Sequence, residues 1–335
     1  MTLHSRSKTV SGTAAPATAP APSLPPLLRS ELLSSLPGLV HGFSTRRGGV
    51  STVYAVRPRR SQRAQRSLPA DFGELNLGLT PEDTRDNVEE NLRRFLAALA
   101  SGRTPGGKVS GLRLVTLKQI HSALVWRDRE GQASGDGIWT TAPGVCVGIR
   151  VADCVPILLA DRRRQAVAAV HAGWRGTLAR IVEKAVGELR AAGSRPDDLV
   201  AAIGPCIRKC CYSVGPEVVQ AFRGRFDDAA TLFGDAEGDP VRDRFPMLFL
   251  TGAPPGHPYD ARWNNDIGAR LDLAEANRRQ LLAAGLAATA VDLLPYCTAC
   301  QPELFFSYRR EGTQTGRMLA AIGRLPAKTG TSRSI

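Results

Sequence analysis

Two apolar runs with a short polar segment between them constrain this chain more than any other feature. Val155–Ala160 and Ala166–Val170 have the composition of strands, and Asp161–Arg164 separates them. This pattern predicts a β-hairpin with a four-residue loop. A loop centred on that segment places Cys154 directly opposite His171, with Cβ atoms about 4.5–5.5 Å apart. A thiol and an imidazole that close could bind one metal ion or act as a nucleophile and its base.

The sequence around His171 adds a possible anion site and a further ligand. His171 opens the segment HAGWRGT, in which glycines flank Trp174 and Arg175 just before an expected helix. Backbone N–H groups and a guanidinium beside an imidazole form an anion-binding arrangement. His121 in KQIHS is a third candidate ligand, and two His with one Cys leave a tetrahedral zinc ion one open position for water or substrate. The alternative is that Cys154 is a small buried side chain and His171 a hydrogen-bonded residue at a strand end.

The rest of the chain mixes strands and helices without a regular alternation. Apolar spacing predicts strands over Leu112–Trp126, which carries His121, and over Val145–Ile149, Leu199–Ile203 and Phe305–Tyr308. It predicts helices over Asn87–Ala100, Thr177–Ala192, Pro216–Phe226 and Asp266–Gly285. The irregular order favours an α+β fold over a doubly wound parallel sheet.

The net charge of +13 is concentrated in three segments that contain no acidic residue. Residues 1–30 carry three basic side chains, residues 46–66 seven arginines, and residues 324–335 three more. The remainder of the chain is electrically balanced, so the total does not require a basic face for specific nucleic-acid binding.

These segments also set the expected organisation. We expect a disordered Pro/Ala-rich extension over residues 1–35, one domain over 36–322 with an Arg-rich loop insertion at about 53–70, and a basic C-terminal tail over 323–335. Arg150 and Asp153 interrupt the longest apolar run, so we expect no membrane span. Seven cysteines, an odd number, and an N-terminal segment without an apolar signal region indicate reduced thiols and a cytoplasmic location.

The remaining thiols have two interpretations. Cys297-x-x-Cys300 could form a structural zinc site with Cys206, Cys210 and Cys211 if the fold brings them together. A second CxxC is absent, and free cysteines are commonly buried, so packed thiols are the favoured interpretation.

Several motifs together carry a specific resemblance to one family. They are HGFSTRRGGVS at 41–51, LNLG at 75–78, KQIHS at 118–122, ADCVPILLAD at 152–161, HAGWRGT at 171–177, IGPCI at 203–207, CYSVG at 211–215 and FFSYRR at 305–310. In this order they resemble the laccase-domain, or polyphenol oxidase, family, now described as bacterial purine nucleoside phosphorylases. The resemblance covers about residues 36–320.

The resemblance implies a single α+β domain with mixed β-sheets between helical layers (α/β/β/α). It implies Zn²⁺ held by the residues that match the family's ligands, His121, Cys154 and His171, which would also be the catalytic residues. The implied reaction is phosphorolysis of adenosine, inosine, guanosine and methylthioadenosine, with adenosine deamination as a second activity. Copper chemistry on phenols, which the older family names suggest, fits poorly because the chain has five histidines and no His-x-His pair.

Phosphorolysis requires an anion held beside the ribose. Arg46, Arg47, Arg175 and Arg309 lie in matching motifs and are the candidate phosphate ligands, with solvation at the surface as the alternative. His41 is the first residue of the first motif and would either contact substrate or pack in the interior.

Three other functions fit parts of the same sequence. The hairpin also suits a cysteine hydrolase or deamidase in which Cys154 is the nucleophile and His171 the base. Within the family, removal of misincorporated serine from cell-wall precursors is a further possibility. The basic segments would suit a nucleic-acid-binding protein, whose affinity would fall steeply with salt.

Overall fold

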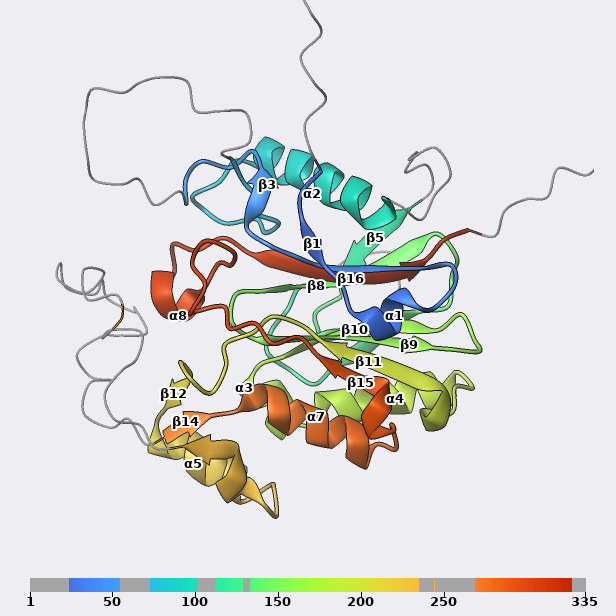
Figure 1. Cartoon of the computed structure of the whole chain (residues 1–335), viewed down its shortest axis with the longest axis vertical. Helices are drawn as coiled ribbons and strands as arrows, with labels where there is room; N and C mark the ends of the chain where they lie inside the picture. The colour runs from blue at the N-terminus through green and yellow to red at the C-terminus, as the bar shows by residue number, and fades with distance from the viewer. Residues whose placement is uncertain are drawn as a thin grey trace, which may run out of the picture.

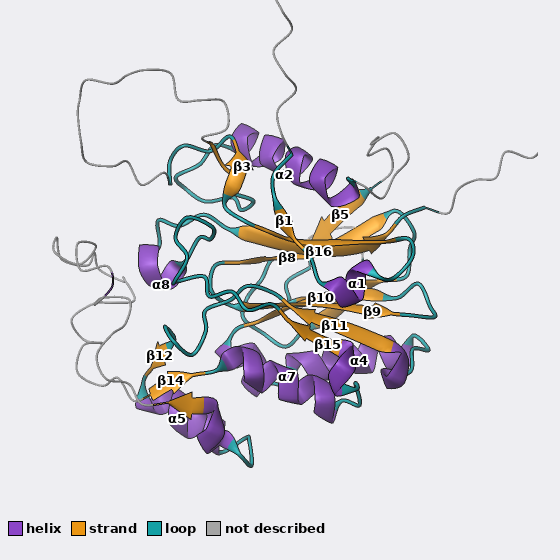
Figure 2. Ribbon diagram, viewed as in Figure 1, coloured by secondary structure: helices purple, strands orange, loops and turns teal. Residues whose placement is uncertain are grey.

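Two β-sheets lie face to face, and helices cover the outer side of each (Figure 1; Figure 2). The computed structural model describes residues 24–54, 73–101, 112–128, 133–234, 244 and 269–326. Its α/β/β/α layering confirms the expected α+β fold class.

The first sheet has the strand order β1-β2-β16-β8-β5. Its strands are β1 (Leu27–Leu28), β2 (Leu39–Ser44), β16 (Met318–Arg324), β8 (Val145–Val151) and β5 (Arg113–Thr116). β16 pairs antiparallel with both β2 and β8, whereas β5 runs parallel to β8. Helix α2 (Arg85–Ala100) covers the outer face, where Phe95 and Leu99 join a buried cluster with Val40 and Ala321. Thr84 caps the N-terminus of this helix, since its Oγ1 accepts from Asn87 N at 3.2 Å.

The second sheet has the order β15-β11-β9-β10-β7-β6. Its strands are β15 (Val291–Leu293), β11 (Leu199–Ile203), β9 (Val155–Asp161), β10 (Val167–Ala172), β7 (Gly137–Thr140) and β6 (Val125–Arg127). Helices α3 (Trp174–Leu178), α4 (Ile181–Ala191) and α7 (Leu273–Ala283) cover its outer face. In β9, Ile157 and Leu159 pack toward these helices, and Leu158 and Ala160 pack between the two sheets. Both faces of β9 are therefore buried, which explains its continuous apolar sequence.

Smaller elements flank the two sheets. They are α1 (Glu31–Ser34), the pair β3 (Arg47–Gly49) and β4 (Gly73–Glu74), the three-stranded group β12 (Ser213–Val214), β14 (Ala269–Leu271) and β13 (Phe233–Gly234), α5 (Pro216–Arg223) and α8 (Tyr308–Glu311). Short 3₁₀ turns lie at Pro196–Asp198, Ala229–Leu232 and Ala288–Ala290.

The predicted β-hairpin exists, but its register is shifted by two residues. His171 lies opposite Pro156 rather than Cys154. Asp161 is the last residue of β9 and not the first of the loop, because its carboxylate accepts from the N–H groups of Arg163 and Arg164 and so begins the turn. A shift of two keeps the faces unchanged, so Cys154 and His171 still share one face as diagonal neighbours.

Two of the expected elements are divided. Leu112–Trp126 is not one strand, since β5 ends at Thr116, β6 begins at Val125, and His121 lies in the loop between them. The expected helix Thr177–Ala192 breaks at Arg180, which has φ 57° and separates α3 from α4.

Three further boundaries were wrong. The helix expected over Asp266–Gly285 begins at Leu273, after strand β14, and residues 266–268 lie outside the described part. The helix expected over Pro216–Phe226 ends at Arg223. Of the strand expected over Phe305–Tyr308, the first three residues form a loop and Tyr308 begins α8, and the last described strand is β16.

Described strands and helices also lie beyond the expected domain ends. The expected extension over 1–35 includes β1 and α1, and the expected tail over 323–335 begins inside β16. Most of the Arg-rich insertion at 53–70 lies outside the described residues. None of the described helices combines the length and apolar character needed to cross a membrane.

Candidate functional site

His121, Cys154 and His171 come together at one end of the hairpin. Their ligand atoms all lie within 4.8 Å of one another. Cys154 Sγ is 3.9 Å from His121 Nε2, and the two imidazole rings meet edge to face with centroids 5.0 Å apart. His171 is buried in β10, Cys154 is half-buried just before β9, and His121 is exposed. The structure therefore brings together the three residues expected to bind a metal.

Asp136, which sequence reasoning missed, positions the two histidines of this cluster. Its buried carboxylate accepts from His171 Nδ1 at 2.8 Å and from the backbone N–H groups of Ile120, His121 and Ser122. These bonds hold the loop that carries His121, whose backbone has φ 56°. Because Asp136 engages Nδ1 of His171, the Nε2 atom is left to act as a ligand.

The three buried groups shift one another's pKa values. Burial alone would disfavour the Cys154 thiolate, but His171 and His121 lower the pKa of this thiol to about 6. Burial would likewise lower the pKa of His171, yet Cys154 and Asp136 raise it to about 9. For Asp136, hydrogen bonds from His171 and Ser122 outweigh burial and lower the pKa to about 2. Without a metal, the site thus favours a thiolate beside an imidazolium.

Two backbone features allow Cys154 to reach this position. A Cβ on Gly173 would lie 3.2 Å from Cys154 Sγ and 3.2 Å from His121 Cδ2, so a side chain here would crowd the cluster. Asp153, with φ 89°, is held by Thr298 Oγ1, Ser307 Oγ and the N–H of Arg309. Loops distant in sequence therefore fix the residue next to Cys154.

The donor set fits a zinc ion. Two imidazole nitrogens and one thiolate are ligands that zinc prefers, with bonds of about 2.0–2.3 Å. In a tetrahedron such bonds place neighbouring ligand atoms about 3.5 Å apart, and the 3.9 Å between Cys154 Sγ and His121 Nε2 is close to that value. Three protein ligands leave one position open, as in catalytic zinc sites.

A cavity of about 700 Å³ opens beside the cluster. Its lining includes His121, Cys154 and His171, together with Gly78, Leu79, Thr116, Leu117, Lys118, Gln119, Arg150, Val151, Ala152, Tyr308 and Arg317. None of these residues is acidic, whereas Lys118, Arg150 and Arg317 are cationic. Cavities of this size hold small-molecule substrates, and this one favours an anionic group.

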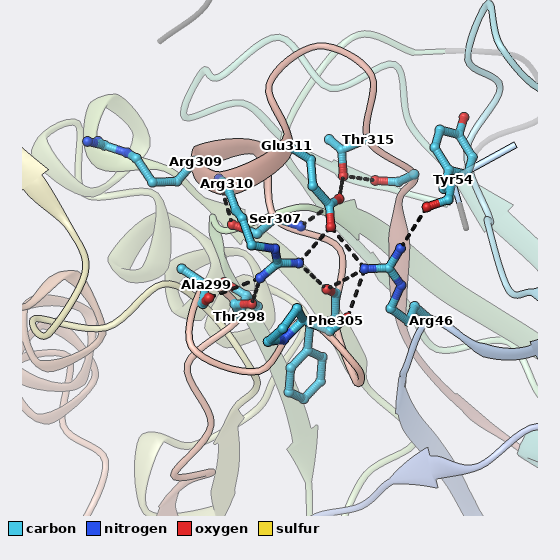
Figure 3. Close-up of polar contacts among 12 residues, drawn as sticks. Arg46, Tyr54, Thr298, Ala299, Phe305, Ser307, Arg309, Arg310, Glu311 and Thr315 are labelled. Carbon is cyan, nitrogen blue, oxygen red and sulfur yellow. Dashed lines mark hydrogen bonds and ion pairs between the residues drawn. The ribbon is translucent and has the colours of Figure 1, made fainter. Parts of the chain in front are cut away.

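Arg46 lies apart from this cavity, in a buried network of its own (Figure 3). Its guanidinium forms ion pairs with Glu74 and Glu311 and donates to the carbonyl oxygens of Tyr54 and Pro302. It also lies 4.6 Å from the centre of the Phe306 ring. These contacts engage the guanidinium in the structure, so Arg46 would have to give up one of them to bind phosphate. Sequence did not reveal this role because the two carboxylates are distant along the chain.

The other expected substrate ligands are also outside the described cavity lining. Arg47 is exposed on β3 and donates to the Glu303 carbonyl, and the exposed Arg175 lies over the Trp174 ring. Arg309 donates to the Ser213 carbonyl and points away from the network of Figure 3. His41 is fully buried in β2, where Nε2 accepts from Ser30 N, so of its two expected roles the structure favours packing.

Four functional candidates were therefore absent from the sequence analysis: Asp136, Lys118, Arg150 and Arg317. Asp136 lies between two glycines directly before β7, a pattern that could have marked it as a special loop residue. The three cations are adjacent only in the fold, since Arg317 is far from the others in sequence.

Comparison with known proteins places this fold and site in one family. The family described as multi-copper polyphenol oxidoreductase laccase matches residues 40–325. The chain belongs to this family, as the motifs predicted.

Individual relatives extend the comparison. A purine nucleoside phosphorylase from Deinococcus radiodurans is 34% identical over 318 residues, covering 94% of this chain and 99% of the relative. An adenosine deaminase from an unknown prokaryote is 34% identical, covering 63% of this chain and 71% of the relative. The crystal structure of YlmD from Geobacillus stearothermophilus matches with a TM-score of 0.63 and 31% identity, covering 90% of this chain and 96% of that one. These similarities support an enzyme with a general purine nucleoside phosphorylase-like function.

Proposed function

We propose that this protein is a zinc-dependent purine nucleoside phosphorylase. It would cleave adenosine, inosine, guanosine and methylthioadenosine with phosphate, and deaminate adenosine as a second activity. The observation that carries the proposal is the position of His121, Cys154 and His171 on the wall of a cavity that also presents three cations. The names of the relatives support both activities. Seven free cysteines favour a reducing compartment such as the cytoplasm.

In this proposal, different residues bind the metal, orient a ligand and attract phosphate. His121, Cys154 and His171 would hold zinc, which when bound supplies Lewis-acid activation of water for deamination. Asp136 keeps the His171 ring in one orientation and one tautomer through the bond to Nδ1. Lys118, Arg150 and Arg317 would attract phosphate to the cavity. Phosphate could then attack the anomeric carbon while the purine leaves.

Assays with and without phosphate test this function directly. Metal-analysed protein is incubated with a panel of nucleosides, and free base, ribose-1-phosphate and inosine are measured. We expect base release only with phosphate, and inosine formation from adenosine without it. Base release that is independent of phosphate would identify a hydrolase and overturn the proposal.

Substitutions then locate the phosphate. Arg317→Gln removes a cation from the cavity wall, and Arg175→Gln removes an exposed one outside the described lining. Losing one charge-assisted hydrogen bond costs about 1.5–3 kcal/mol, or about ten- to a hundred-fold. We expect Arg317→Gln to raise the KM for phosphate by about that factor, with a smaller effect on deamination. A larger increase of the KM for phosphate in Arg175→Gln than in Arg317→Gln would support the prediction that Arg175 holds phosphate. Arg47→Gln and Arg309→Gln are measured in the same way.

A second candidate function rests on the line of contacts from Cys154 through His171 to Asp136. This order of thiol, imidazole and carboxylate also occurs in cysteine hydrolases, where the carboxylate orients the base. Such an enzyme would need no metal. Full hydrolytic activity after chelation would favour it, whereas we expect chelation to abolish deamination.

A further inference from the structure

Four cysteines gather at a second place in the fold, apart from the cluster at Cys154. Cys210 and Cys211 follow β11, and Cys297 and Cys300 follow β15. Their four sulfur atoms all lie within 4.8 Å of one another. Cys300 Sγ is 3.5 Å from Cys210 Sγ and 3.3 Å from Cys211 Sγ. Of the five thiols considered from the sequence, only Cys206 is outside this group.

The spacing of the sulfur atoms fits a single tetrahedral ion. With zinc–sulfur bonds of about 2.3 Å, an ideal tetrahedron has edges of about 3.8 Å between sulfurs. The two short separations and the 4.8 Å limit bracket this value. A polynuclear iron–sulfur cluster would hold its cysteine sulfurs farther apart, because several irons lie between them.

Local backbone structure directs the thiols toward one point. The Arg208 carbonyl accepts from the N–H groups of Cys211 and Tyr212, which forms the turn that presents the two adjacent cysteines. Cys297 forms a parallel β-bridge with Cys206, and Thr298 N donates to the Cys206 carbonyl, so the segment of Cys297 is held beside the one that leads to Cys210.

Packing alone explains this arrangement poorly. The apolar cluster here is small, with Ile207, Cys211, Cys297 and Ala299 as its buried members. Cys210 is exposed, yet its sulfur still lies with the other three. An exposed thiol that only filled space would bury little apolar surface by pointing toward the other three sulfur atoms.

We propose that Cys210, Cys211, Cys297 and Cys300 form a structural site for one Zn²⁺ ion. Four thiolates complete the tetrahedron, leaving no position for substrate, which is the pattern of a structural rather than a catalytic site. The ion joins two segments almost ninety residues apart. Its binding free energy therefore contributes to folding. This proposal is independent of the proposed function, because none of the four thiols lines the cavity described above.

The site would also support the catalytic cluster. Thr298 lies between two of the proposed ligands, and its hydroxyl donates to the Asp153 carboxylate. Ile207 N donates to the Asp153 carbonyl, from the segment that leads to Cys210. The ion would thus hold in place two of the segments that fix Asp153, the residue before Cys154.

Metal content of the full-length protein tests the proposal. Each variant is loaded with zinc, desalted and analysed for bound metals. We expect two zinc ions per chain in the wild type, one in Cys154→Ala and one in Cys297→Ser/Cys300→Ser. Cys146→Ser, which alters a buried thiol in β8 outside both clusters, is the matched control and should keep two. A single ion in the wild type and none in Cys154→Ala would overturn the site, and iron in place of zinc would overturn its assignment.

A second measurement does not require the double variant to fold. In Cys154→Ala, cobalt loading should give the strong visible absorption of a tetrahedral thiolate site, and Cys210→Ser should weaken it. Alkylation followed by peptide mapping should find the four cysteines protected until zinc is chelated. Equal alkylation before and after chelation, or a disulfide between Cys211 and Cys300, would contradict the proposal.

Discussion

Asp136 shows how one carboxylate can position the residues of a site without itself being among the described lining of the cavity. It binds His171 and three consecutive backbone N–H groups of the loop that carries His121. It therefore couples the position of two proposed ligands. Neither hydropathy nor spacing reveals such a residue, because its partners come from separate segments.

Replacing this carboxylate should weaken metal binding. In Asp136→Asn one of the two acceptor oxygens becomes an NH2 donor, so either His171 Nδ1 or the Ser122 N–H loses its acceptor. Loss of such a partner typically lowers metal affinity about 10- to 100-fold. Zinc affinity is measured by competition with a chromophoric chelator. Asp197→Asn, at a carboxylate whose side chain is 79% exposed, is the control. An unchanged affinity in Asp136→Asn would show that the loop and the ring are held by other contacts.

The charge state of Cys154 leads to a prediction about its reactivity. Because neighbouring imidazoles lower its pKa to about 6, the thiolate of the metal-free protein should persist down to about that pH. The rate of alkylation by iodoacetamide should be nearly constant above about pH 7 and fall below pH 6, measured at Cys154 by peptide mapping. In His171→Gln the pKa should move upward, so the rate should still be rising at pH 8. Zinc should suppress alkylation throughout, and an unprotected thiol would instead favour the cysteine hydrolase.

At the level of elements, the β9–β10 hairpin could be predicted from the sequence, whereas the loop that carries His121 could not. The two apolar runs identified both strands and placed Cys154 and His171 on the same face. The register was off by two residues because the Asp161 side chain begins the turn, an effect that apolar patterning does not report. Apolar patterning predicts a strand at the loop of His121, because the neighbouring residues are apolar. The left-handed backbone of His121 depends instead on its bond to Asp136, which the pattern does not report.

The junction between β10 and α3 offers a test at this level. Gly173→Ala would place a methyl group 3.2 Å from Cys154 Sγ and from His121 Cδ2, so the ligands must shift. We expect weaker zinc binding with little change in thermal unfolding of the metal-free protein. Gly187→Ala, in α4 with open space around the new methyl, should leave zinc affinity unchanged and stabilise the helix by about 0.5–1 kcal/mol. Equal zinc affinity in both variants would contradict the proposed crowding.

For the whole molecule, the motifs identified the family, and both the irregular order of the expected elements and the family resemblance predicted the α+β fold class. The ends of the domain did not follow, because short elements such as β1 and α1 carry too few residues for a periodic pattern. The network around Arg46 could not be predicted either, since Glu74 and Glu311 come close to Arg46 only in the folded chain. Figure 3 shows the contact with Glu311.

Two N-terminal truncations test where the fold begins. Removing residues 1–35 deletes β1, buried Leu33 and Arg29, whose guanidinium donates to the His41 and Ala98 carbonyls. Burial of one leucine alone contributes about 1.5–3 kcal/mol, so we expect a clearly lower free energy of unfolding in urea. Removing residues 1–23 should leave that free energy unchanged. Equal stability of the two truncated proteins would contradict the role assigned to these elements.

The central strand of the first sheet is also the last of the described strands. β16 lies between β2 and β8, and both pair with it along most of its length. During synthesis, the edges of β2 and β8 that face β16 therefore remain unpaired until the segment Met318–Arg324 has been made. Unpaired strand edges readily join other chains. A nascent chain that stalls just before Met318 should consequently be a target for chaperones or proteases, although it already contains every residue proposed to bind zinc.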